Sequence, residues 1–178
     1  QFSPKKMTSH KKNLLITGGA GFIGSNFINY IYKKYPNYNI QLLDALTYAG
    51  NLENISNNLK SNGHFQFYHS NVTQPDIVNQ LVSDSDIVVH FAAESHVTRS
   101  IYDNSLFFET DVIGTQVLAN AIINHPVERF IHISSSEVYG TALKAPMTED
   151  HPLNPMSPYA AAKAGADRLV YSYVHTYG

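Results

Sequence analysis

Residues 13–24 read Asn-Leu-Leu-Ile-Thr-Gly-Gly-Ala-Gly-Phe-Ile-Gly, and this stretch decides the fold. Its first part, Asn13 to Thr17, is short, mostly apolar and stopped by glycine, which predicts a buried strand. A helix is expected next, extending to about Lys34. A glycine-rich turn between such a strand and helix is typical of a dinucleotide site. The glycines let the backbone approach a pyrophosphate, and the helix N-terminus offers free N–H groups.

The helix after this turn carries Ile23, Phe27 and Ile31 at a spacing of four, so we expect these side chains on its buried face. Beyond it, short β-rich runs alternate with helical runs. Strands are expected at about 38–43, 65–69, 86–91 and 130–134, and helices at about 75–82, 105–124 and from Pro158, with Ser157 as N-cap. This alternation implies crossover connections and a parallel sheet. We therefore predict an α/β, Rossmann-like, doubly wound parallel sheet with helices on both faces.

Composition restricts the classes of protein that remain. The 178 residues include 12 basic and 14 acidic side chains, with 43% apolar and 15% charged residues, which indicates a globular protein without general attraction to nucleic acid. The absence of cysteine excludes disulfides, thiolate nucleophiles and zinc–thiolate sites. No uninterrupted apolar run reaches the roughly 18 residues that a membrane span needs.

The nine histidines do not have the spacing of metal ligands, because no His-x-His or His-x-x-x-His pair occurs. His90 and His132 lie in expected buried strands. We expect both to be hydrogen-bonded core groups, and we predict no metal site.

Asp44 closes the second expected strand, 20 residues after Gly24. A carboxylate at this position can accept hydrogen bonds from both hydroxyls of an adenosine ribose, and it would repel a 2′-phosphate. No Arg or Lys occurs between Asp44 and Asn51 to bind such a phosphate. The sequence therefore favours NAD over NADP as the cofactor.

Tyr159 and Lys163 are four residues apart in the last expected helix, so they share one face. A phenol with its ordinary pKa of about 10 is a poor base at pH 7. A nearby ammonium stabilises the phenolate and lowers that pKa. The pair can then accept the proton of an alcohol during its oxidation. Tyr-x-x-x-Lys is common by chance, and it becomes specific only together with the glycine turn.

Five segments carry a resemblance to a known family: Thr17–Ser25, Leu46–Leu52 (Leu-Thr-Tyr-Ala-Gly-Asn-Leu), Phe91–Val97 (Phe-Ala-Ala-Glu-Ser-His-Val), Glu137–Gly140 and Ser157–Lys163. Through them the chain resembles the extended short-chain dehydrogenases/reductases that act on nucleotide sugars. Within that group it is most similar to the dTDP-glucose 4,6-dehydratases. The segment after Asp44 is the most discriminating of the five.

The resemblance implies roles by position. The implied cofactor-binding residues are Gly18, Gly21, Phe22, Ile23, Gly24, Asp44, Ala45, Leu46, Thr47, Asn71, Val72, Phe91, Ala92, Ala93, Ser95, Thr110, Tyr159 and Lys163. The implied catalytic residues are Ser135, Ser136, Glu137, Tyr159 and Lys163. Ser95 and Ser135 are also implied to contact the sugar nucleotide, and Glu137 matches the base that removes the C5 proton.

The resemblance is incomplete at Ser136, where the dTDP-glucose enzymes have an Asp as general acid. A serine hydroxyl hardly ionises at pH 7. GDP-mannose 4,6-dehydratases and UDP-glucuronate decarboxylases have Ser-Glu here, whereas plain 4-epimerases usually lack the glutamate. Three functions stay open: an NAD-dependent nucleotide-sugar 4,6-dehydratase, a UDP-glucuronate decarboxylase or 4-epimerase, and a non-catalytic NAD-binding regulatory domain.

We expect residues 1–12 to be a flexible tail and residues 13–178 to form an NAD-binding Rossmann domain that includes the Tyr-Lys helix. The resemblance implies a homodimer. From composition we also expect a cytoplasmic location and no membrane or nucleic-acid partner. The resemblance also implies a family nearly twice as long. The chain is therefore expected to be truncated before the C-terminal substrate-binding part.

Overall fold

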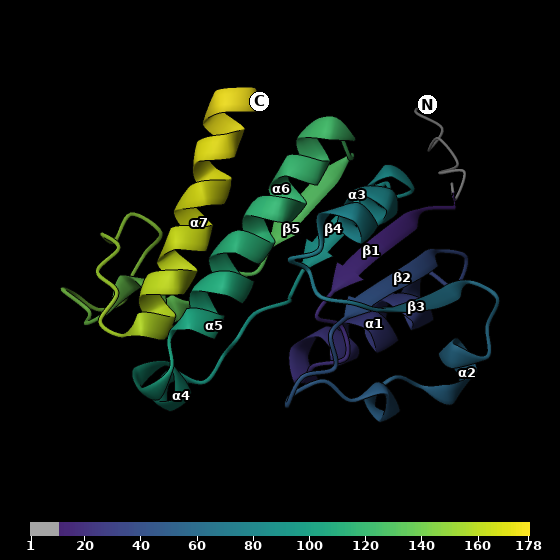
Figure 1. Ribbon diagram of the computed structural model, residues 1–178, viewed down its shortest axis with the longest axis horizontal. Coiled ribbons are helices and arrows are strands. Elements are labelled where there is room, and N and C mark those ends of the chain that lie inside the picture. Colours follow the sequence, from purple (N-terminus) through teal and green to yellow (C-terminus); the bar gives the residue numbers. More distant parts are fainter. Residues whose placement is uncertain (1–10) are drawn as a thin grey trace, which may run out of the picture.

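The computed structural model describes residues 11–178, so most of the predicted tail at 1–12 lies outside the described residues. One five-stranded parallel sheet has the order β3-β2-β1-β4-β5 (Figure 1). The strands are β1 Asn13–Thr17, β2 Asn39–Asp44, β3 Phe65–His69, β4 Ile87–His90 and β5 Arg129–His132. The strand order reverses between β1 and β4, where open parallel sheets bind ligands. The predicted Rossmann-like fold is confirmed.

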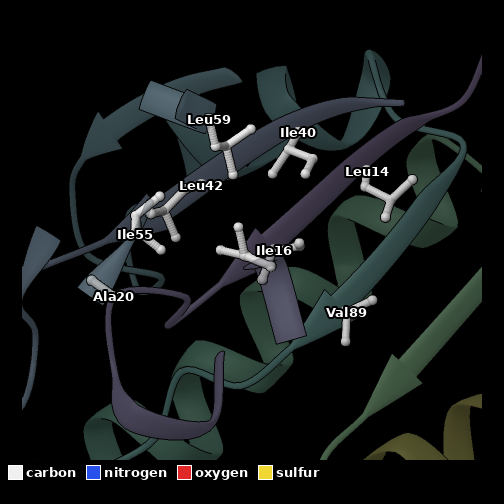
Figure 2. Close-up of a cluster of buried hydrophobic side chains, with 9 residues drawn as sticks. Leu14, Ile16, Ala20, Ile40, Leu42, Ile55, Leu59 and Val89 are labelled. Carbon is white, nitrogen blue, oxygen red and sulfur yellow. The ribbon is translucent and has the colours of Figure 1, made fainter. Parts of the chain in front are cut away.

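Alternating side chains of the central strands enter two separate cores. Leu14 and Ile16 of β1 lie on one face with Ile40 and Leu42 of β2, as Figure 2 shows. Leu15, on the opposite face, packs in a second cluster. Because both faces are covered, β1, β2 and β4 are mostly apolar, as parallel strands usually are, whereas the edge strands β3 and β5 are partly exposed.

Helices cover the two faces in the manner of a doubly wound sheet. On the first face, the core includes Ile28 of α1 (Phe22–Lys34) and Leu59 of α2 (Asn57–Lys60). On the second face, α3 (Pro75–Ser83) packs beside α6 (Gly114–Asn124). The last helix, α7 (Pro158–Tyr177), lies alongside α6 at the far side of the molecule (Figure 1).

The face predicted for α1 was partly wrong. Ile28 is fully buried, and Phe27 and Ile31 pack against the core, but Ile23 is 64% exposed. Ile23 lies in the first turn of the helix, which borders a cleft rather than the sheet. Its apolar side chain therefore faces that cleft, and the buried stripe begins one turn later.

The expected helix at 105–124 is one helical run with an irregular middle. It consists of α5 (Ser105–Phe107), a π-helical turn η2 (Phe108–Ile113) and α6. π-Turns often occur at functional sites. Short helical segments were not predicted: η1 (Leu52–Asn54), α2, α4 (Val97–Tyr102) and η3 (Ser136–Tyr139).

Among the described residues, Ser105–Asn124 is the one helical run long and apolar enough to cross a membrane by length and composition. Core helices of soluble proteins pass the same test. Here 44% of the apolar window is buried inside the molecule, and the run packs against α3 and α7. It also contains Asp111, a buried carboxyl group in the middle of the run.

Candidate active site

A cleft of about 410 Å³ opens at the carboxyl ends of the strands. Its lining includes every predicted cofactor-binding residue except Leu46: Gly18, Gly21, Phe22, Ile23, Gly24, Asp44, Ala45, Thr47, Asn71, Val72, Phe91, Ala92, Ala93, Ser95, Thr110, Tyr159 and Lys163. The side chain of Leu46 packs against the core instead. A larger polar depression of about 610 Å³ lies at the opposite ends of the strands, and none of the predicted site residues lines it.

The glycine turn has no room for side chains. Gly18 has a φ of +68°, and a Cβ added to it would lie 2.4 Å from the backbone nitrogen of Ala92. A Cβ on Gly24 would lie 2.6 Å from the carbonyl oxygen of Gly18. Because Gly18 has no side chain, the glycine turn can lie against the backbone that follows β4. Because Gly24 has none, the start of α1 can pack closely against the same turn. The N-cap of α1 is Gly21, which has no side chain to cover the first-turn N–H groups.

Asp44 connects the glycine turn to the loop that follows β2. Its Oδ2 accepts a hydrogen bond from the Ala20 amide at 2.9 Å, and its Oδ1 accepts one from the Leu46 amide at 2.8 Å. Leu46 has a φ of +48°, which turns the chain sharply here. Asp44 therefore has a structural function besides the predicted ribose contact, and the motif alone did not indicate it.

Tyr159 and Lys163 project from α7 toward β5. The Tyr159 hydroxyl donates to the Ser135 Oγ at 3.4 Å, and the Lys163 ammonium donates to the Ile133 carbonyl at 2.8 Å. Ser157 caps α7 as predicted, because its Oγ accepts the Ala160 amide at 3.1 Å. Burial lowers the pKa of Lys163, although the carboxylates of Asp111 and Asp167 oppose this shift.

The remaining predicted catalytic residues lie on the short turn after β5. Ser135 is the N-cap of η3, and its Oγ accepts the Glu137 amide at 3.2 Å. Ser136 and Glu137 are exposed. Ser135 and Ser136 line a neighbouring depression of about 470 Å³, beside the Tyr159 cleft. Glu137 follows Ser136 on the same turn and is among the lining residues of neither this depression nor the cleft.

Two buried carboxyl groups near Lys163 were not predicted. Glu94 is 3% exposed and Asp111 is 1% exposed. The Glu94 amide donates to Asp111 Oδ1 at 2.7 Å, while Glu94 Oε2 and Asp111 Oδ2 are buried without a hydrogen-bond partner. Burial raises the pKa of Asp111 to about 7 and also raises the pKa of Glu94. The acidic residues Glu109 and Asp111 in the mostly apolar run 105–124 were a signal in the sequence, but they do not show which of the two is buried.

A buried hydrogen-bond chain supports the wall formed by Phe91 and Ala92. His90 contacts the Thr17 Oγ1 through Nδ1 at 2.6 Å and the Thr115 Oγ1 through Nε2 at 3.0 Å. Thr115 donates to the Asp111 carbonyl at 2.5 Å, and Thr17 accepts the Ala92 amide at 3.4 Å. Burial lowers the pKa of His90, which favours the neutral ring, and this arrangement then fits an imidazole that donates from Nε2 and accepts at Nδ1.

His90 is thus a hydrogen-bonded core group, as predicted. The same prediction is wrong for His132. Neither of its ring nitrogens has a hydrogen-bond partner, and burial lowers its pKa to about 4. Within the described residues, no group of three or more His, Asp or Glu side chains is arranged to hold a metal ion.

Known proteins are similar to this chain over most of its length. The chain is 46% identical over 165 residues to the low-salt glycan biosynthesis protein Agl12 of Haloferax volcanii, covering 93% of this chain and 53% of that protein. It is 45% identical over 168 residues to a dTDP-glucose 4,6-dehydratase of Mycobacterium tuberculosis, covering 93% and 50%. The crystal structure of the dTDP-glucose 4,6-dehydratase DesIV from Streptomyces venezuelae, with NAD bound, superposes with a TM-score of 0.87 at 43% identity, covering 93% and 52%. The chain spans about half the length of these relatives.

Fold and site together define an extended short-chain dehydrogenase/reductase of the kind that acts on nucleotide sugars. The model of the GDP-mannose 4,6 dehydratase family matches residues 15–178. The chain belongs to that family, which confirms the class predicted from its motifs.

Proposed function

We propose that the chain is the cofactor-binding part of an NAD-dependent nucleotide-sugar 4,6-dehydratase similar to dTDP-glucose 4,6-dehydratase. The observation that carries this proposal is the meeting of Tyr159, Lys163 and Ser135 beside the glycine-turn cleft. The cleft supports this proposal, because it is lined by the glycine turn at the start of α1 and by Asp44, which is proposed to hold a ribose. Bound NAD would supply a reversible hydride acceptor.

Tyr159 is proposed to take the proton of the sugar 4-hydroxyl at its phenolic oxygen. The Lys163 ammonium, one helical turn further on, stabilises the phenolate. Lys163 is held by the Ile133 carbonyl, which fixes its position without removing its charge. Ser135 is within hydrogen-bonding distance of Tyr159 and can orient the same hydroxyl.

Glu137 is proposed to remove the C5 proton once C4 is oxidised. What supports this role is that Glu137 is exposed on the η3 turn, next to the serines that line the depression beside the cleft. Ser136 cannot act as a strong acid, so we propose that it positions the departing 6-hydroxyl or relays a proton from water. Because the chain spans about half the length of its relatives, we also propose that a C-terminal substrate-binding part supplies further contacts to the sugar nucleotide.

The test is to incubate the natural full-length protein separately with dTDP-glucose, UDP-GlcNAc and GDP-mannose. A product that has lost one water and gained a 4-keto group is expected for one of them. The Tyr159→Phe variant should still bind NAD and should form this product about 10²- to 10⁴-fold more slowly. Bound NAD without any dehydrated product from these three substrates would contradict the proposal.

A second candidate follows from Ser136. A UDP-glucuronate decarboxylase would release carbon dioxide from UDP-glucuronate, and a 4-epimerase would change sugar configuration without loss of mass. A non-catalytic NAD-binding regulatory domain is the third candidate. In that case the protein binds NAD but turns over none of these sugar nucleotides.

We also propose that the protein forms a homodimer in the cytoplasm. Exposed apolar side chains support the dimer, and they gather on the run from α5 to α6 and on α7: Leu106, Phe108, Ile113, Ile123, Tyr171, Val174 and Tyr177. Sedimentation at several concentrations tests the association. A monomer at micromolar concentration would contradict it.

A further inference from the structure

One side-chain contact joins two segments that border the cleft. The guanidinium carbon of Arg99 lies 3.9 Å from the centre of the Tyr48 ring. Cations within about 6 Å of a ring centre are attracted to its π face. Tyr48 comes from the loop after β2, and Arg99 comes from α4. In the described part of the chain, the other three such pairs join close sequence neighbours, for example Arg168 and Tyr171.

The positions of the two residues relate this contact to the cleft. Thr47 and Ala49, on either side of Tyr48, both line the cleft. On the other side, Glu94 and Ser95 line it, and the chain then enters α4. Tyr48 and Arg99 do not line the cleft themselves, so the stacked pair links the segments beside its two walls. In Figure 1, α4 lies near the start of α7, on the side toward which the strand arrows point.

We propose that Tyr48 and Arg99 form a strap across the opening of the cleft and slow the release of bound dinucleotide. This inference rests on the proposed function. A 4,6-dehydratase returns the hydride to the sugar within the same turnover, so it does not need to exchange its dinucleotide between turnovers. Slow release is then compatible with rapid turnover, which is not so for an enzyme that must replace a reduced cofactor each time.

Both side chains suit this function. Tyr48 is 50% exposed and Arg99 is also exposed, so neither is needed for the core. Arg99 remains charged at every physiological pH. The charge of Arg99 also acts on the cleft wall. It partly opposes the rise in the pKa of Glu94 that burial causes. Arg99 can therefore affect a bound pyrophosphate by its charge alone, and an experiment must separate this effect from the strap.

The experiment measures the dissociation rate of NADH from the natural full-length protein, by the loss of its fluorescence after an excess of NAD is added. The variants are Tyr48→Leu, Arg99→Gln and the double variant. Tyr48→Phe, which keeps the ring, is the matched control. We expect Tyr48→Leu to release NADH about three- to tenfold faster, in line with the strength of such contacts. Tyr48→Phe should be close to the parent.

The double variant separates the strap from the charge effect. We expect Tyr48→Leu to have little further effect once Arg99→Gln is present, because the contact is already lost. Equal effects of Tyr48→Leu in both backgrounds would overturn the strap, as would unchanged release from Tyr48→Leu. If the parent protein binds no NAD or NADH, both the strap and the proposed function are overturned. Binding with unchanged release overturns the strap alone.

Discussion

Asp111 has an unusual pH dependence at the scale of a single residue. Burial raises its pKa from 3.8 to about 7, so between these pH values the folded protein holds a proton that the unfolded chain releases. Stability contributed by this group is therefore lost as the pH rises from about 4 to 7. Above pH 7 the buried carboxylate destabilises the fold by up to about 4 kcal/mol.

The Asp111→Asn variant should remove this penalty, because an amide oxygen can still accept the Glu94 amide. Its free energy of unfolding in urea should exceed that of the parent at pH 8, and the difference should shrink toward pH 4. The exposed Asp84→Asn is the control and should not show this gain. An equal change at both pH values would exclude ionisation of Asp111 as the cause.

Local sequence was sufficient for some site residues and not for others. Gly18, Asp44 and the Tyr159–Lys163 pair follow from short motifs, because their spacing along one turn or helix sets their geometry. Glu94 and Asp111 meet only when η2 packs beside the end of β4. Their contact depends on tertiary structure, and no local pattern predicts it.

The β1–α1 connection is the element most sensitive to substitution. Gly18→Ala places a Cβ 2.4 Å from the backbone nitrogen of Ala92, just after β4. It also forces an alanine to adopt the positive φ of Gly18. We expect a loss of at least about 2 kcal/mol in the free energy of unfolding. Gly63→Ala is the control, since an added Cβ there meets nothing within 4 Å. Equal losses in the two variants would contradict the close packing of the turn.

The start of α7 depends on its N-cap. Ser157→Ala removes the acceptor for the Ala160 amide and should cost about 1 kcal/mol in thermal unfolding. Ser157→Asp, which keeps an acceptor, should stay close to the parent. Because Tyr159 lies in the first turn of this helix, Ser157→Ala should also slow the proposed dehydration by the full-length protein more than Ser157→Asp does.

Regular elements could be predicted more accurately than irregular ones. β1 and β3 have the predicted bounds, since each is a short β-rich run ended by a turn signal. β4 and β5 end earlier than predicted, because Phe91 and Ser134 leave the sheet to line the cleft. The π turn and α4 were missed, since they are determined by packing around the site and not by periodicity.

At the scale of the whole molecule, NAD should stabilise the folded state by mass action. A ligand at about one hundred times its dissociation constant adds about 2.7 kcal/mol to the free energy of unfolding. We expect the melting temperature to rise with NAD and to change little with an equal concentration of NADP, because Asp44 would repel the 2′-phosphate. Asp44→Asn should reduce this discrimination. Equal stabilisation by both dinucleotides would contradict the assignment.

The hydrogen-bond chain through His90 has a consequence for the kinetics of binding. It connects β1, β4 and the helix after η2, and all its contacts lie within the folded chain. The contacts that support the wall formed by Phe91 and Ala92 are therefore complete without a ligand, and we expect this wall to be rigid before any dinucleotide arrives. Association should follow a single exponential whose rate increases linearly with dinucleotide concentration, and the amide of Ala92 should exchange with solvent equally slowly with and without ligand.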